Sequence, residues 1–426
     1  MDTFTESLCK FLDESHSAYH AQAALRRELE AAGYVQLAEG DAWALAAGGK
    51  YFVCRGGAAV IAFRIPEQAP RGFLLAAAHT DRPSLKLKEN GETVSAYVSQ
   101  QVERYGGLLV SPWLDRPLSI AGRALVQTES GAQVRLIDID RDLMLIPNVA
   151  IHMNRQANEG YKWNPAVDTL PLIGGAGAAG KLPALLEKEA GGKILGQDLY
   201  LYIRQKATVW GVDEEYISSA ALDDLECAWG CTQGFLRGKE SGSIPVLCVF
   251  DSEEVGSVSP QGAASSLLED TLTRICDCLR LNRGRMLAQS FLVSADNAHA
   301  VHPNHPEYAD PNNAPVMGGG PVIKYNANLS YCTDSVSAAV FRKICAGAGV
   351  RTQSFHNRAD LRGGSTLGGI SLGHVSVPTV DIGLAQLAMH SCYETAAVSD
   401  AIDLETAMEA YYGASLEATQ KGFSIL

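Results

Sequence analysis

The sequence lacks a secretory pattern and any long apolar run. Its first segment, MDTFTESLCKFLDESHSAYH, has no basic start followed by an apolar stretch, and we interpret it as an amphipathic helix. No apolar run approaches the roughly 18 residues of a membrane span. We therefore expect a cytoplasmic protein with no membrane partner.

Cysteine pairs and positive charge are also scarce. The 10 cysteines are scattered and none forms a C-x-x-C pair, which favours reduced, buried thiols over a disulfide framework or a Cys-rich zinc site. Asp and Glu (48) outnumber Lys and Arg (35), and the formal net charge is −13. This balance argues against a nucleic-acid partner, and an acidic substrate would need a local positive group to overcome it.

The remaining composition is that of a globular protein large enough for several domains. It is 46% hydrophobic and 19% charged, and 426 residues leave room for two or three domains of about 150 residues. Helical spacing over residues 2–32 is followed by short β-rich runs. From residue 218 onward helices and strands alternate, ending in a helix predicted over residues 403–419.

This alternation predicts an α/β fold whose site lies at the ends of strands. The middle of the chain differs, because it offers many β-rich segments separated by turns. We therefore expect one discontinuous domain, residues 1–88 and 222–426, split by an inserted β-rich unit at residues 89–221.

Four segments and a pair of glutamates contain residues that could bind metal ions or act in catalysis. In HTDRP, His79 and Asp81 would share one face of a strand, where the carboxylate can orient the imidazole of a metal ligand. Alone, this H-x-D pattern is more often structural. In ALDDLE, residues Asp223, Asp224 and Glu226 fit the first turn of a helix, although one aspartate could instead bridge two metal ions.

The third segment, SADNAHAVHPNH, follows an apolar strand. Asp296 stands at the strand end, where an open α/β sheet binds ligands. His299, His302 and His305 are spaced three apart, but Pro303 breaks a helical face. We expect Asp296 to be the residue that takes part in the chemistry of the site, with His299 and His302 as supporting groups.

The fourth segment, AQLAMHSCYE, places His390 shortly after another predicted strand. In FDSEEVGS, Glu253 and Glu254 follow the apolar run 244–250. Neighbouring side chains of a strand point to opposite faces, so the two glutamates would have separate tasks. Together the segments supply two imidazoles and three carboxylates, which suffice for a two-zinc site with one bridging carboxylate.

A glycine-rich segment offers an alternative. GGAGAAGK, ending at Lys181, satisfies the first part of a phosphate-binding loop. The next residues are Leu182 and Pro183, so the hydroxyl that would hold magnesium is missing. A surface loop is favoured, and a nucleotide-binding enzyme remains the alternative of a different class.

Several motifs, in this order, resemble the aspartyl aminopeptidase family of cocatalytic dizinc exopeptidases in clan MH. They are HTDRP, VAIHMNRQANEG, ALDDL, DSEEVGS, SADNAHAVHPNHP, GPVIKYNAN, GGSTLG and QLAMHS. The resemblance implies a mixed-sheet zinc-peptidase catalytic domain split by an inserted dimerisation domain. It also implies release of N-terminal Asp or Glu from peptides by a homo-oligomer built from dimers, a tetrahedral dodecamer.

The resemblance assigns the site residues as well. One zinc would be held by His79, Asp223 and Asp296, and Asp223 would bridge to a second zinc held by Glu254 and His390. Asp81 would orient His79. Glu253 would be the general base that takes a proton from the attacking water and passes it to the departing amine.

Two further residues would act in substrate binding. Lys324, in GPVIKYNAN, matches the family position that pairs with an acidic substrate side chain, although a solvated lysine on an exposed strand is the common alternative. His152, in VAIHMNR, matches a histidine that the family supplies to the active site of the neighbouring subunit.

The sequence departs from the family at two positions. Asp224 stands where Asn is common, and Arg82 stands where Ser is common. We expect neither to contact a predicted ligand, but either could change substrate preference. Two alternatives therefore accompany the dizinc aminopeptidase: an aminopeptidase of broad or neutral specificity, and a catalytically silent homologue acting as a scaffold.

Overall fold

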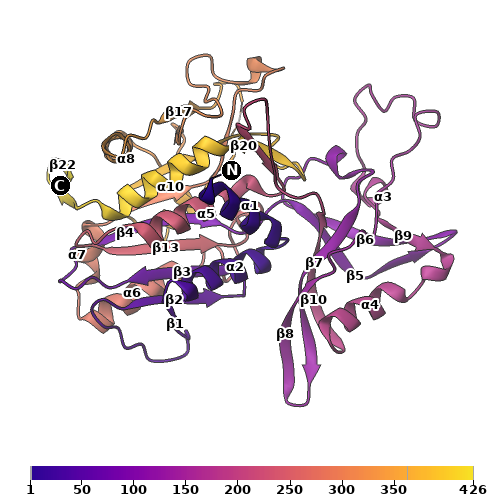
Figure 1. Ribbon diagram of the computed structural model, residues 1–426, viewed down its shortest axis with the longest axis horizontal. Coiled ribbons are helices and arrows are strands. Elements are labelled where there is room, and N and C mark those ends of the chain that lie inside the picture. Colours follow the sequence, from indigo (N-terminus) through magenta and orange to yellow (C-terminus); the bar gives the residue numbers. More distant parts are fainter. Residues whose placement is uncertain (1, 362, 426) are drawn as a thin grey trace.

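A computed structural model describes residues 2–361 and 363–425, and its centre is a nine-stranded mixed sheet (Figure 1). The central strands β13, β4, β14 and β18 run parallel to one another. In spatial order the sheet comprises β1 (Val35–Gln36), β2 (Lys50–Arg55), β3 (Ala59–Arg64), β13 (Ile244–Phe250), β4 (Phe73–His79), β14 (Phe291–Ala295), β18 (Thr379–Gly383), β16 (Val322–Tyr325) and β17 (Gln353–His356).

Helices cover both faces of this sheet, which explains why its central strands are continuous apolar runs. Alternate residues of β3 serve opposite cores: Val60 and Ala62 pack in one, Ile61 and Phe63 in the other. The first core includes α1 (Thr3–Glu14), α2 (Ala18–Ala31), α5 (Leu222–Arg237), α8 (Ser335–Gly347) and α10 (Val398–Gly413). The second includes α6 (Leu267–Leu279), α7 (Arg283–Ala288) and α9 (Leu367–Leu372).

A second, antiparallel sheet forms a separate unit at the right of Figure 1. We call residues 84–203 the inserted unit and the rest of the chain the main unit. In spatial order its strands are β8 (Gly131–Asp138), β7 (Leu118–Thr128), β10 (Ile194–Ile203), β5 (Ser84–Val94), β6 (Tyr97–Tyr105) and β9 (Leu172–Gly175). Its helical segments are η1 (Ser111–Trp113), α3 (Pro165–Asp168), η2 (Ala176–Ala178) and α4 (Lys181–Ala190).

Smaller sheets complete the main unit. The five-stranded sheet comprises β11 (Thr208–Trp210), β12 (Tyr216–Ser219), β20 (Glu394–Ala397), β19 (Ala385–Leu387) and β15 (Ala298–His299). The terminal hairpin pairs β21 (Leu416–Thr419) with β22 (Gly422–Ile425). Two further short helical segments are η3 (Glu253–Val255) and η4 (Pro306–Tyr308).

The predicted α/β class with a mixed sheet is confirmed, but several boundaries differ. The expected boundary at residue 88 falls inside β5, and β12, which lies before residue 222, pairs with β20 of the main unit. The helix predicted over residues 403–419 begins at Val398 and ends at Gly413, because Leu416 is buried in the strand that follows.

The other expectations from composition can be compared with the structure directly. Six of the ten cysteines are buried, as expected, whereas Cys278 is exposed. The helical region at residues 2–32 is two helices, because the Ser17 side chain caps a new helix by accepting the N–H of His20. No helix among the described residues is long and apolar enough to cross a membrane.

Candidate metal centre

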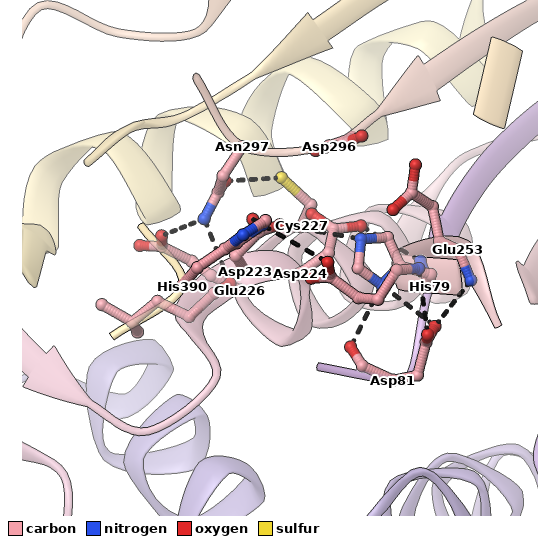
Figure 2. A network of polar contacts seen from close by, with 12 residues as sticks. His79, Asp81, Asp223, Asp224, Glu226, Cys227, Glu253, Asp296, Asn297 and His390 are labelled. Atoms are coloured by element: carbon pink, nitrogen blue, oxygen red, sulfur yellow. Dashed lines mark hydrogen bonds and ion pairs between the residues drawn. The ribbon is translucent and has the colours of Figure 1, made fainter. Parts of the chain in front are cut away.

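The predicted ligands meet near the ends of the parallel strands, and Figure 2 shows four of the five: His79, Asp223, Asp296 and His390. His79 is the last residue of β4, Asp296 follows β14, and Glu254 follows β13. Asp223 lies in the first turn of α5, and His390 lies in the loop between β19 and β20. Since the carboxyl ends of parallel strands share one edge of a sheet, His79, Glu254 and Asp296 are brought into one pocket, although His79 and Asp296 are 217 positions apart.

Asp223 lies between the two imidazoles. Its Oδ1 is 3.6 Å from Nε2 of His79, and its Oδ2 is 3.7 Å from Nε2 of His390. Glu254 Oε2 is 3.3 Å from the same Nε2 of His390. Each oxygen of Asp223 therefore faces a different histidine, the arrangement that a bridging carboxylate requires.

These side chains form overlapping groups whose ligand atoms lie within 4.8 Å of one another. The groups are His79, Asp223, Asp224 and Asp296; Asp223, Glu254 and His390; and His79, Glu253 and Glu254. Within them, Asp223 Oδ1, Asp224 Oδ1 and Glu254 Oε1 are buried without a hydrogen-bond partner. Buried carboxylate oxygens are costly unless a cation satisfies them, and imidazole with carboxylate is a donor set that zinc accepts. The residues present therefore fit zinc.

Asp81 connects His79 to the paired glutamates. Nδ1 of His79 donates to the main-chain carbonyl of Asp81 (3.1 Å) and lies 3.4 Å from Asp81 Oδ1. The carboxylate of Asp81 accepts the N–H groups of Glu253 and Glu254, each at 3.1 Å, and the hydroxyl of Tyr105 at 2.8 Å. By binding Nδ1, Asp81 orients the imidazole of His79 so that Nε2 faces the metal pocket. The hydrogen-bond partner of a ligating histidine commonly has this role.

Glu253 and Glu254 do not lie on a strand. β13 ends at Phe250, and both glutamates belong to the short helix η3, entered through Ser252 with a positive φ of 66°. The prediction that the side chains of Glu253 and Glu254 point to opposite faces of a strand is therefore wrong. Both side chains have an atom near His79. Burial, followed by the charge of Asp296, raises the pKa of Glu253 to about 8, a range suited to a general base or acid.

Asp224 contacts a predicted ligand, contrary to the expectation from sequence. Its Oδ2 accepts the N–H of His79 at 3.1 Å, and the residue is fully buried. Asp224 is thus part of the pocket wall. Arg82 behaves differently, because its guanidinium donates to the carbonyl of Ser15 between α1 and α2, at 2.6 Å.

Lys324 is buried rather than solvated. Its Nζ donates to the carbonyls of Asp296 (2.6 Å) and Asn297 (3.1 Å) and lies 3.7 Å from Asp296 Oδ1. The lysine therefore supports the segment that carries Asp296. His299 lies on β15 and His302 in the following loop, and in the described part of the chain neither supplies an atom to the ligand groups above.

The inserted unit contacts this pocket, which sequence reasoning missed. Gly107 accepts a hydrogen bond from His390 Nδ1 (3.0 Å), and Leu109 donates its N–H to the carbonyl of His390. A Cβ at Gly106, whose φ is +72°, would lie 3.2 Å from Cβ of Glu254. The GG pair after β6 was the available signal: it allows the backbone to approach the ligands closely.

Two other predicted features lie in the inserted unit. His152 is exposed in the loop between β8 and α3, and among the described residues it supplies no atom to the ligand groups. In the glycine-rich segment, the N–H of Gly180 donates to both oxygens of Glu92, at 2.9 and 3.0 Å. A carboxylate of the chain itself thus takes the place of a phosphate, and nothing supports nucleotide binding.

Comparisons with known proteins agree with the chemistry of this pocket. Residues 11–412 match the family described as Aminopeptidase I zinc metalloprotease (M18). The probable M18 family aminopeptidase 2 of Clostridium acetobutylicum is 41% identical over 425 residues, covering 96% of this chain and 98% of that protein. Its namesake in Pseudomonas paraeruginosa is 40% identical over 426 residues, with the same coverage.

Solved structures agree as well. The cryo-EM structure of the Ape4 and Nbr1 complex has a TM-score of 0.93 at 33% identity, covering 96% of this chain and 85% of that chain. The crystal structure of prApe1 has a TM-score of 0.91 at 25% identity, covering 96% and 93%. The chain therefore belongs to the M18 family of zinc metallopeptidases, the aminopeptidase I and aspartyl aminopeptidase type of clan MH, and is an aminopeptidase.

Proposed function

We propose that this aminopeptidase uses two zinc ions per subunit. His79, Asp223 and Asp296 would hold one, and Asp223, Glu254 and His390 the other. The observation that carries the proposal is the position of Asp223, whose two oxygens face the two imidazoles at 3.6 and 3.7 Å. When bound, the ions would polarise the scissile carbonyl and lower the pKa of water.

Side chains of the protein would carry out the proton transfers of the reaction. Glu253 would take a proton from the attacking water and deliver it to the amine that leaves when the first peptide bond breaks. That amine becomes the N-terminus of the shortened peptide, and the released amino acid keeps the new carboxylate. Asp81 would hold Glu253 in place through the N–H that it accepts at 3.1 Å.

We further propose a preference for N-terminal Asp or Glu. The chain carries a net charge of −13, so an acidic side chain needs a local cation, and Lys324 lies beside Asp296 at the edge of the pocket. Two carbonyls and the Asp296 carboxylate already surround this ammonium, which leaves broad or neutral specificity as the alternative.

One comparison of substrates tests this preference. Initial rates on aspartyl, glutamyl, leucyl and lysyl chromogenic amides should be highest for the acidic pair, and chelation should abolish all four activities. A clear preference for the leucyl amide would remove the role given to Lys324. Activity that survives complete chelation would contradict the metal mechanism itself.

The enzyme is also proposed to be a homo-oligomer of dimers in the cytoplasm. Three apolar side chains around His152 are exposed: Val149 (51%), Ile151 (48%) and Met153 (83%). Apolar groups gathered in one loop suit an interface. The similar structure of Saccharomyces cerevisiae mApe1, at 24% identity, is a dodecamer, and a tetrahedral dodecamer is proposed here. His152 would then enter a neighbour's active site and bind the substrate.

A further inference from the structure

One buried carboxylate outside the ligand set holds the backbone of two proposed ligands at once. Glu394 Oε1 accepts the N–H of His390 at 2.7 Å, and Glu394 Oε2 accepts the N–H of Asp223 at 3.0 Å. The residue is only 1% exposed. His390 and Asp223 are 167 positions apart in the chain, so this carboxylate is a direct connection between two distant segments.

Both segments need such a connection because their backbones are in unusual conformations. His390 has a φ of +67°, and Ala221, two residues before Asp223, has a φ of +59°. Residues other than glycine are disfavoured in this left-handed region, so surrounding contacts must hold them there. The bonds from Glu394 are contacts of this kind.

Glu394 is itself fixed by the five-stranded sheet. It is the first residue of β20, directly opposite Ser219 of β12, and β19 pairs along the other side of β20. The His390 loop joins β19 to β20, whereas Asp223 follows β12 along the chain. The carboxylate thus lies at the junction of the two segments, on a strand that is paired on both sides.

We propose that Glu394 is a positioning residue for the second metal site, setting the separation of Asp223 and His390. The proposal rests on the two-zinc function proposed above and adds a residue that binds neither metal nor substrate. A carboxylate suits this task because both its oxygens accept hydrogen bonds. An amide in its place would present an N–H to one of the two backbone N–H donors.

The substitution Glu394→Gln tests the proposal with little change in volume. Loss of an outer partner costs about 10–100-fold in metal affinity. We expect Glu394→Gln to lose one of its two zinc ions at chelator concentrations that leave the wild type fully loaded, measured by metal analysis of the purified enzyme after dialysis. The cobalt-substituted variant should also show an altered visible absorption spectrum.

Asp400→Asn is the matched control. Asp400 is also fully buried, and its oxygens accept the N–H groups of Gly320 (2.8 Å) and Gly318 (2.7 Å), which belong to no proposed ligand. This variant loses the same kind of bond, so it should be destabilised but should release both ions at wild-type chelator concentrations. A spectrum and zinc affinity unchanged in folded Glu394→Gln would overturn the proposal.

A measurement on the wild type covers the case in which Glu394→Gln does not fold. If Glu394 holds the loop without help from the metal, the amide of His390 should remain protected from hydrogen exchange after the enzyme is stripped of zinc. Rapid exchange there would overturn the proposal. A wild-type enzyme that binds only one ion would instead contradict the two-zinc function, so the two failures are distinguishable.

Discussion

Nε2 of His390 lies 3.3 Å from Oε2 of Glu254, and the other carboxylate oxygen of Glu254, Oε1, is buried without a partner. This pair connects the loop after β19 to the short helix after β13. An imidazole and a carboxylate so placed can ligate one ion together. The adjacent Glu253 shares a group with His79 and Glu254 but does not belong to the group that contains His390.

The first prediction concerns Glu254. The substitution Glu254→Gln replaces a charged ligand by a neutral amide, so the enzyme should lose one of its two zinc ions, together with most of its activity. Metal analysis after gel filtration measures the loss. Retention of both ions at wild-type affinity would show that Glu254 is not a ligand.

The second prediction concerns its neighbour. Glu253→Gln should keep both ions, because Glu253 is not among the proposed ligands, while kcat falls about 10²–10⁴-fold through loss of the general base. The two variants differ by one position and carry the same chemical change, so each is the other's control. Loss of an ion from Glu253→Gln with kcat preserved would reverse the assignments.

The sequence predicted much of the metal pocket because motifs place their residues at strand ends. The apolar strands before His79 and Asp296 predicted that both residues lie at strand ends, whereas their proposed roles as ligands came from the resemblance. The separate tasks of Glu253 and Glu254 could not be derived locally, since the chain leaves β13 at Phe250 and turns through Ser252 into a helix. The resemblance supplied those roles, and strand alternation did not.

Other parts of the site could not be predicted because they act through the backbone or across the two units. Glu394 stood inside a quoted motif, but its bonds to main-chain N–H groups leave no pattern in the sequence. Tyr105 and Gly107 lie in the inserted unit, and only the folded chain brings them to Asp81 and His390. Strand pairing also places the boundaries of the inserted unit, because β5 belongs to its sheet and β12 pairs with β20 outside it. These boundaries differ from the positions at which the sequence becomes rich in short β segments.

The third prediction concerns Asp224, a buried carboxylate beside Asp223 and Asp296. Burial holds the pKa of Asp224 well above its usual range; the charge of His79 opposes this shift, and the charges of Asp296 and Asp223 add to it. In Asp224→Asn the amide oxygen can still accept the N–H of His79. The metal-free variant should therefore melt at a higher temperature than the metal-free wild type, and zinc should raise its Tm by less.

Thermal melts with and without added zinc measure both effects. The control is Asp400→Asn, which also replaces a fully buried carboxylate, and it should leave the zinc-dependent rise in Tm unchanged. A larger zinc-dependent rise in Asp224→Asn than in the wild type would show that the extra charge does not support metal binding.

The fourth prediction concerns stability and pH. Glu226 is fully buried, and burial, followed by the charge of Asp400, raises its pKa from 4.5 to about 8. Between these pH values Glu226 keeps its proton in the folded chain and has released it in the unfolded chain. The contribution of Glu226 to the free energy of unfolding therefore falls as pH rises from about 4.5 to about 8, and it is constant above that pH. The contribution is at most about 5 kcal/mol.

Glu226→Gln removes this ionisation and keeps the shape of the side chain. Its stability relative to the wild type should therefore increase from pH 5 to pH 8, as measured by half-lives of thermal inactivation at several pH values. Glu417→Gln, at an exposed position of β21, should follow the wild type throughout. Parallel profiles for Glu226→Gln and the wild type would mean that Glu226 ionises normally in the folded chain.

The fifth prediction concerns the proposed exchange of His152 between subunits. Chains with His152→Ala and chains with Glu253→Gln should each be inactive alone. In a mixed pair, the chain that retains Glu253 receives His152 from its neighbour, so one intact site forms. Random mixing should restore about a quarter of wild-type activity, because half of the pairs are mixed and each has one working site. Mixed oligomers, verified by two affinity tags, that show no recovery would place the action of His152 within its own subunit or outside catalysis.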